Sequence, residues 1–221
     1  MNALPSGIVL MALLLGLQVG GCGRRTPQPR PATPAQPAPA TDSPEAIRVL
    51  LYPVEDLRQV HLETASAALQ EAYGAAVEVR DSASTPAGAY DARRKQYLAS
   101  AFLEALDGIS GEATGEAKLL AVTALDLYAP DLNFVFGQAQ MGGRAAVVSV
   151  ARLDPRFFGD EPDEDLLAER LTKETVHEVG HCLGLRHCPN PRCVMHFSNS
   201  LADTDAKKAQ PCDNCRRRIA R

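Results

Sequence analysis

The stretch HEVGHCLGLRHC, residues 177–188, predicts a metal site at the end of a long amphipathic helix. His177 and His181 are four residues apart, so they project from one face of a helix, where two neutral imidazoles can bind one metal ion. Glu178 is rotated off that face by about 100°. We therefore expect Glu178 to lie beside the metal, within reach of a bound water, as a base and not as a ligand.

A third histidine can join this site only if the chain turns back. His187 follows His177 by ten residues, and a continuous helix would carry it about 15 Å along the axis. Gly184 lies between the two, and glycine adopts the left-handed conformation that commonly ends a helix without steric cost. The spacing predicts that the helix ends at Gly184 and that His187 completes a site of three histidines.

The cysteines predict a second metal site. Four of the six cysteines lie within the last 34 residues, in HCPNPRC and CDNC: Cys188, Cys193, Cys212 and Cys215. Four thiolates in two close pairs fit tetrahedral structural zinc, which we prefer, whereas two disulfides are the alternative in an oxidising compartment. Cys182 follows a predicted metal ligand directly, and we expect it to be a small buried apolar group.

The N-terminal residues predict export. Residues 7–21, GIVLMALLLGLQVGG, form an apolar run with the length of a signal-peptide core, too short to span a bilayer comfortably. The run leads into VGGC, which resembles the lipobox of bacterial lipoproteins, although no Lys or Arg precedes it. We expect residues 1–21 to be a signal peptide and Cys22 to carry lipid. An ordinary cleaved signal and an uncleaved anchor are the alternatives.

A tether and one domain are expected after Cys22. Residues 22–44 are rich in proline among small and polar residues, a composition that favours extended conformations and cannot build a core. Residues 45–221 have the size of a single domain. The expected location is outside the cytoplasm, on a bacterial membrane and facing the periplasm or the cell surface.

The net charge argues against nucleic acid as a partner. It is -4 at pH 7, with both signs mixed along the chain, so no strong positive field is expected. The basic run Arg216 to Arg218 is interpreted as a solvated helix end, which the helix dipole favours.

Apolar periodicity predicts strands first and the metal-binding helix last. We expect strands at 46–53 and 75–80 around a helix at 57–72, then a helix at 92–106, a strand from 118 to about 126, and a hairpin of 132–140 with 144–153. The hairpin supplies the antiparallel strand. A helix at 164–184 follows, and residues 185–221 show little apolar periodicity, so this last segment is expected to depend on metal for its structure.

The motif H-E-x-x-H-x-x-G-x-x-H with a methionine shortly after it resembles the metzincin clan of zinc peptidases. Within that clan the chain is similar to the archaemetzincin family, by Cys188 and Cys193 before Met195 and by the distal C-x-x-C. YDARRKQY, residues 90–97, and the stretch at 123–153 also resemble that family. The resemblance implies an α/β (α+β) domain with a five-stranded mixed sheet, long helices and a Met-containing turn beneath the catalytic zinc.

The resemblance also implies the activity. It implies two zinc ions per chain, one catalytic on the three histidines and one structural on the four cysteines, and hydrolysis of peptide or protein substrates with Glu178 as general base. The alternative is a zinc-stabilised binding module with little or no turnover. His196 is expected to be exposed or hydrogen-bonded and not a ligand, and the sequence assigns no role to Asp126 or Tyr128.

Overall fold

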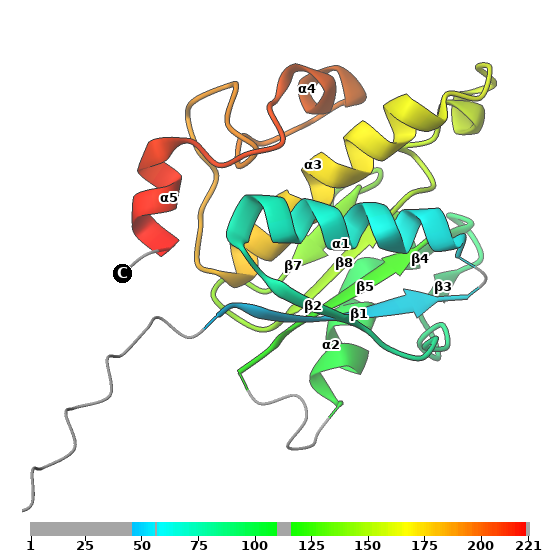
Figure 1. The fold of residues 1–221 in the computed structure, drawn as a ribbon. Helices are drawn as coiled ribbons and strands as arrows, with labels where there is room; N and C mark the ends of the chain where they lie inside the picture. Colours follow the sequence, from blue (N-terminus) through cyan, green and yellow to red (C-terminus); the bar gives the residue numbers. More distant parts are fainter. Residues whose placement is uncertain (1–45, 56, 110–115, 220–221) are drawn as a thin grey trace, which may run out of the picture. The chain divides into compact units, whose positions relative to one another are not determined.

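The computed structural model describes residues 46–55, 57–109 and 116–219, all within one compact unit at residues 43–221. The predicted signal peptide, Cys22 and the tether lie outside the described residues. The elements follow in this order (Figure 1): β1 Arg48–Val54, α1 Gln59–Tyr73, β2 Ala76–Val79, β3 Tyr90–Asp91, β4 Gln96–Leu98, α2 Ala99–Asp107, β5 Lys118–Thr123, β6 Leu127–Tyr128, β7 Gly137–Ala139, β8 Ala145–Ser149, the 3-10 helix η1 Pro155–Phe158, α3 Glu164–Cys182, α4 Leu201–Ala206 and α5 Asp213–Ile219.

The main sheet has five strands in the order β2-β1-β5-β8-β7. The first four are parallel and β7 is antiparallel to β8. The central strands are buried on both faces, which is why β5 and β8 read as continuous apolar runs such as LLAV and AAVV. The mixed five-stranded sheet and its antiparallel hairpin strand are confirmed.

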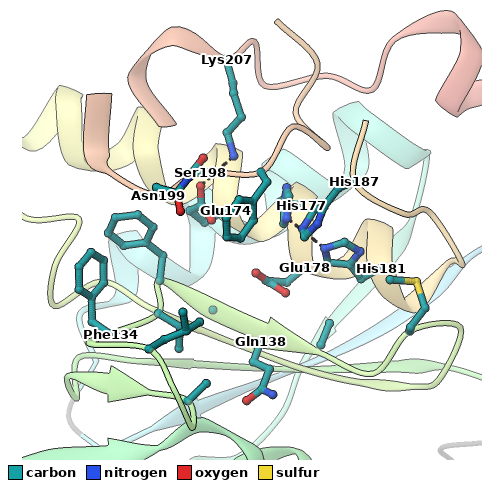
Figure 2. A pocket seen from close by; sticks show the side chains of 18 of the residues that line it. Phe134, Gln138, Glu174, His177, Glu178, His181, His187, Ser198, Asn199 and Lys207 are labelled. Carbon is teal, nitrogen blue, oxygen red and sulfur yellow. Dashed lines mark hydrogen bonds and ion pairs between the residues drawn. The ribbon is translucent and has the colours of Figure 1, made fainter. Parts of the chain in front are cut away.

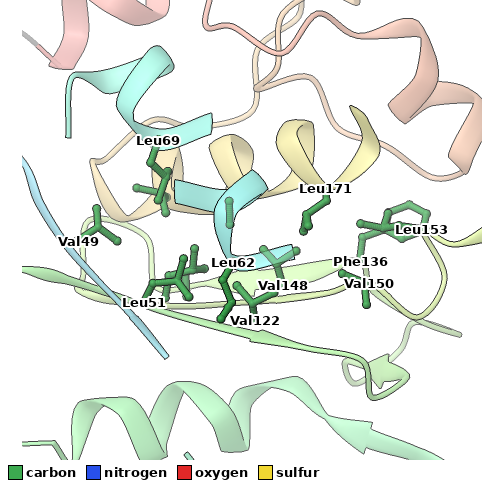
Figure 3. Packing of buried hydrophobic residues seen from close by; sticks show 14 of the residues in the cluster. Val49, Leu51, Leu62, Leu69, Val122, Phe136, Val148, Val150, Leu153 and Leu171 are labelled. Carbon is green, nitrogen blue, oxygen red and sulfur yellow. The ribbon is translucent and has the colours of Figure 1, made fainter. Parts of the chain in front are cut away.

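Helices cover both faces of this sheet. In Figure 1, α1 and α3 lie on one face and α2 lies on the other. Alternate residues of the same strand face the two layers, because side chains alternate along a strand. Figure 3 shows the core on the α1 and α3 side, to which the sheet and the two helices contribute Val49, Leu51, Val122, Val148, Leu62, Leu69 and Leu171. On the other side Leu50, Leu119 and Val147 pack with Phe102 of α2.

The helix predicted at residues 92–106 begins later than expected. The structure places its first residue at Ala99, and residues 90–98 form the antiparallel pair β3 and β4. The Asp91 carboxylate accepts hydrogen bonds from the backbone N–H groups of Arg93 (2.8 Å) and Arg94 (3.2 Å), which closes a turn where the helix was expected. The strand β4 then pairs with β6, outside the main sheet.

Further boundaries differ from the sequence prediction. The strands expected at 132–140 and 144–153 are shorter and comprise only Gly137–Ala139 and Ala145–Ser149. The strand expected to reach about residue 126 ends at Thr123, whose hydroxyl oxygen accepts a hydrogen bond from the Leu125 N–H, and Leu127 to Tyr128 belong to the smaller sheet. The C-terminal segment contains two short helices, α4 and α5, that were not predicted. Within the described ranges, no helix combines the length and the apolar character needed to cross a membrane.

Candidate active site

The first two predicted ligands face one another near the end of α3. The Nδ1 atom of His177 lies 2.8 Å from the Val194 carbonyl oxygen, and Nδ1 of His181 lies 2.7 Å from the Leu185 carbonyl oxygen. A carbonyl can only accept, so each Nδ1 must be the donor, and each neutral ring then presents a lone pair on Nε2. These two Nε2 atoms are 3.0 Å apart. Two facing lone pairs at this distance call for a shared cation.

His187 joins the pair because the helix ends as predicted. Gly184 has a φ of 84°, in the left-handed region, and the N–H of Leu185 donates to the Gly180 carbonyl at 2.9 Å. The His187 ring lies 4.9 Å from the His181 ring, centroid to centroid, and a nitrogen of each histidine lies within 4.8 Å of the others. The three histidines therefore form one catalytic zinc site, open on the side of the exposed His187.

The electrostatics of the histidines suit a metal site. Burial lowers the pKa of His177 well below its ordinary value and also lowers the pKa of His181 and His187. All three imidazoles are consequently neutral at physiological pH, which is the form that binds zinc.

Glu178 lies beside the three histidines and is buried, with 6% of its surface exposed. Within the described part of the chain, its carboxylate has no hydrogen-bond partner. Burial, followed by the nearby Glu174 carboxylate, raises the pKa of Glu178 well above its usual range. The side chain packs closely against β7: a Cβ atom added to Gly137 would lie 2.6 Å from Glu178 Cγ.

Met195 packs against α3 at Gly180, close in sequence to the helical histidines. It is fully buried, and a Cβ atom added to Gly180 would lie 2.5 Å from its sulfur and 2.6 Å from the Tyr73 hydroxyl. Gly180, which stands between the two helical histidines in sequence, thus leaves the space that the sulfur occupies. This contact fixes the position of the predicted turn that contains Met195.

The four cysteines form the second site. Their sulfur atoms lie within 4.8 Å of one another, with 3.8 Å from Cys188 to Cys212 and 3.8 Å from Cys193 to Cys215. Zinc–sulfur bonds of about 2.3 Å in a tetrahedron place sulfurs about 3.8 Å apart, whereas a disulfide needs about 2.05 Å. The cysteines of the described chain are free thiols. The arrangement is a structural zinc site.

A backbone hydrogen bond stabilises the thiolate form of Cys212. The N–H of Cys215 lowers the pKa of Cys212 to about 7, whereas burial raises the pKa of Cys193 and Cys215. Burying several thiolates together needs a cation to balance them, and zinc provides that charge.

A cavity of about 450 Å³ opens in front of the histidines. Figure 2 shows Glu178 between the histidines and the strand that carries Gln138, with Lys207, Ser198 and Asn199 on the opposite side of the cavity. Sequence reasoning missed two charged residues here. Glu174 and Lys207 are buried and paired, with 3.1 Å between Oε1 and Nζ. Glu174 lies one helical turn before Glu178, and that spacing could have indicated it from the sequence. No sequence signal points to Lys207.

Other residues considered at the sequence level lie outside the metal sites. His196 Nδ1 is 2.9 Å from the Cys188 carbonyl oxygen, so its hydrogen-bonded role is confirmed. Cys182 is buried and lies 3.4 Å from the Ala145 carbonyl oxygen, and burial raises its pKa to about 12. Asp126 forms a bidentate salt bridge with Arg152, whose Nε and Nη2 lie 2.6 and 2.9 Å from the two carboxylate oxygens.

The fold and its two metal sites define a zinc metallopeptidase. A model of Peptidase family M54 matches residues 54–221. The chain is 50% identical to the archaemetzincin of Pyrococcus horikoshii over 131 residues, 59% of this chain and 69% of that protein. It is 41% identical to the archaemetzincin of Natronomonas pharaonis over 176 residues, 78% of this chain and 99% of that protein.

A solved structure agrees with these relatives. The crystal structure of archaemetzincin from Methanopyrus kandleri is 40% identical, with a TM-score of 0.69, and the match covers 80% of this chain and 97% of that one. The chain therefore belongs to peptidase family M54 and is a zinc-dependent metallopeptidase, a hydrolase.

Proposed function

We propose that this chain cleaves peptide bonds of peptide or protein substrates in the cavity, with Glu178 as the general base. The observation that carries the proposal is the position of Glu178: a buried carboxylate without a hydrogen-bond partner in the described chain, beside three histidines that share one site. His177, His181 and His187 would hold zinc, which supplies an activated water and polarises the scissile carbonyl when bound.

Glu178 then moves the proton. Its carboxylate takes a proton from the water as the oxygen attacks the carbonyl carbon, and the resulting acid gives that proton to the amine nitrogen as the C–N bond breaks. Burial raises the pKa of Glu178, so its carboxylate binds a proton more readily than an exposed carboxylate would. Met195 supports the histidines by packing and takes no part in proton transfer.

Replacing Glu178 by Gln tests this mechanism. The amide keeps the size of the side chain but cannot accept the proton, so we expect kcat to fall by about 10²- to 10⁴-fold. Zinc content and melting temperature should stay those of the parent. Peptides from a random library, read by mass spectrometry, provide the substrate. A Glu178→Gln variant that cleaved as fast as the parent would remove Glu178 from the mechanism.

We also propose that the enzyme is exported and held at a bacterial membrane by lipid on Cys22. The apolar run at 7–21, the VGGC stretch and the proline-rich residues 22–44 support this location. Mass spectrometry of the protein from its native membrane should find an acylated N-terminus at Cys22. An unmodified chain that starts at Met1 would contradict the proposal.

A further inference from the structure

One wall of the cavity is formed by a segment with little regular structure. Residues 129–136, between β6 and β7, contribute Leu132, Asn133 and Phe134 to the cavity. Few backbone hydrogen bonds stabilise the segment. The N–H of Leu132 donates to the Ala129 carbonyl at 3.2 Å and the N–H of Val135 to the Leu127 carbonyl at 3.0 Å, and only at its end does the Phe136 carbonyl accept from Ser149 at 2.8 Å. Asp131 has a φ of 66°, in the left-handed region that non-glycine residues rarely adopt. The shape of this wall therefore needs support from elsewhere.

Arg94 provides that support from the β3 and β4 hairpin. Its Nη2 donates to the carbonyl oxygens of Leu132 (2.7 Å) and Asn133 (3.0 Å), and its Nε donates to Oε1 of the buried Gln96 (3.1 Å). Gln96 Nε2 in turn donates to the Asn133 carbonyl at 3.0 Å. The guanidinium also lies over the Tyr128 ring, 4.4 Å from its centroid. Two consecutive carbonyls of the wall are thus held by one arginine.

A second arginine holds the next residue of the wall. Arg152 is held by its salt bridge with Asp126, and its guanidinium lies 4.6 Å from the centroid of the Phe134 ring. Neither Arg94 nor Arg152 lines the cavity. Both act on it only through the wall, and Figure 2 shows Phe134 on the sheet side of the cavity, across from Lys207.

We propose that Arg94 is a positioning residue that sets the shape of this wall and thereby the affinity for ligands with an apolar side chain. The wall presents Leu132, which is 45% exposed, and Phe134, so an apolar group is the chemical match. The inference rests on the proposed peptidase function and gives the hairpin sequence YDARRKQY a role at the active site. Arg94 itself is exposed and outside the core, so its loss leaves the fold in place.

The neighbouring arginine offers a matched control. Arg93 is also exposed and on the same hairpin, but among the described residues only its backbone makes a hydrogen bond. Arg93→Gln therefore removes the same charge without touching the wall. We compare Arg94→Gln with Arg93→Gln in the zinc-loaded protein. Arg94→Lys, which keeps the charge and can donate to one carbonyl, should give an intermediate effect.

The probes are leucine hydroxamate and glycine hydroxamate, which carry the same zinc-binding group and the same amino group and differ only in the apolar side chain. For Arg94→Gln we expect the Kd of leucine hydroxamate, measured by calorimetry, to rise about tenfold, while the Kd of glycine hydroxamate changes less than about twofold. In peptide cleavage, KM should rise with kcat nearly unchanged. Amide hydrogen exchange at residues 132–135 should accelerate. Arg93→Gln should leave all five quantities unchanged.

Two results would overturn the proposal. One is that Arg94→Gln and Arg93→Gln show the same Kd for leucine hydroxamate or the same rate of amide hydrogen exchange at residues 132–135. The other is equal weakening of both hydroxamates, which would mean that Arg94 acts on the zinc site and not on the wall. A parent protein that cleaves no peptide would count against the peptidase proposal only, because the hydroxamate comparison does not need turnover.

Discussion

At the residue scale, the position of Glu178 depends on a glycine of the neighbouring strand. A Cβ atom at Gly137 would lie 2.6 Å from Glu178 Cγ, 3.0 Å from its Cδ and 2.7 Å from the Val147 carbonyl oxygen. None of these atoms can move away freely, because Val147 O is backbone in β8 and Glu178 is buried. Packing against Gly137 therefore fixes the position of the Glu178 carboxylate, the proposed general base, and no hydrogen bond within the described chain does so.

Gly137→Ala should consequently reduce turnover. A displacement of the carboxylate by about 1 Å can cost about 10²-fold in kcat, and we expect a loss of that order with both zinc ions retained. The effect should disappear when Glu178 is already replaced: Gly137→Ala added to Glu178→Gln should cause no further loss of residual activity. Steady-state kinetics of the four proteins measure this, and equal losses in both backgrounds would contradict the explanation.

The histidines, Glu178 and Gly184 could be predicted from the sequence because their contacts follow from helix geometry and one turn. Lys207 and Arg94 could not, because their partners are distant in sequence and depend on how the C-terminal segment and the hairpin pack. Gly137 gives no signal either, since the clash it avoids exists only between two elements.

At the element scale, the C-terminal segment after α3 is held by polar contacts and metal more than by a large core. Arg170 of α3 forms a bidentate salt bridge with the carboxylate of Asp205 in α4, with N–O distances of 2.7 and 2.8 Å. Lys173 Nζ donates to the Asp205 carbonyl oxygen at 2.9 Å. The Glu174 and Lys207 pair adds a buried contact. The cysteine site joins the two ends of the same segment.

Cys212→Ser should therefore destabilise the segment that carries Met195. Loss of one thiolate removes the structural zinc, and we expect the melting temperature to fall by about 10 °C. Activity should fall indirectly, as the packing under the histidines loosens. Scanning calorimetry and zinc analysis measure both effects, with Cys182→Ala as the control that keeps two zinc ions. Retention of both zinc ions in Cys212→Ser would contradict the four-cysteine site.

Long elements with many apolar residues could be predicted from the sequence. Short elements and helix ends could not, because side-chain hydrogen bonds to the backbone decide where they begin. The helix expected at 92–106 began late because the Asp91 carboxylate takes the N–H groups of the next turn. The helix α4 had a readable signal in Ser200 and Asp203, which form a capping box. That pattern was obscured because the surrounding segment has few apolar residues.

At the scale of the whole molecule, the two zinc sites share one segment but differ in exposure. The catalytic site includes the exposed His187 and opens to the cavity, whereas Cys193 and Cys215 are buried. Three neutral imidazoles leave a coordination position for water, while four thiolates enclose their metal and bind it more tightly. The two ions should therefore differ in how easily they are removed.

Zinc content measured together with peptidase activity during stepwise chelation tests the account most directly. The purified domain should contain two zinc ions per chain. Mild chelation should remove one ion and abolish activity, while circular dichroism shows the fold retained; added zinc should restore cleavage. A single zinc ion in the active parent, disulfides among Cys188, Cys193, Cys212 and Cys215, or full activity after the first ion is lost would contradict the two-site account.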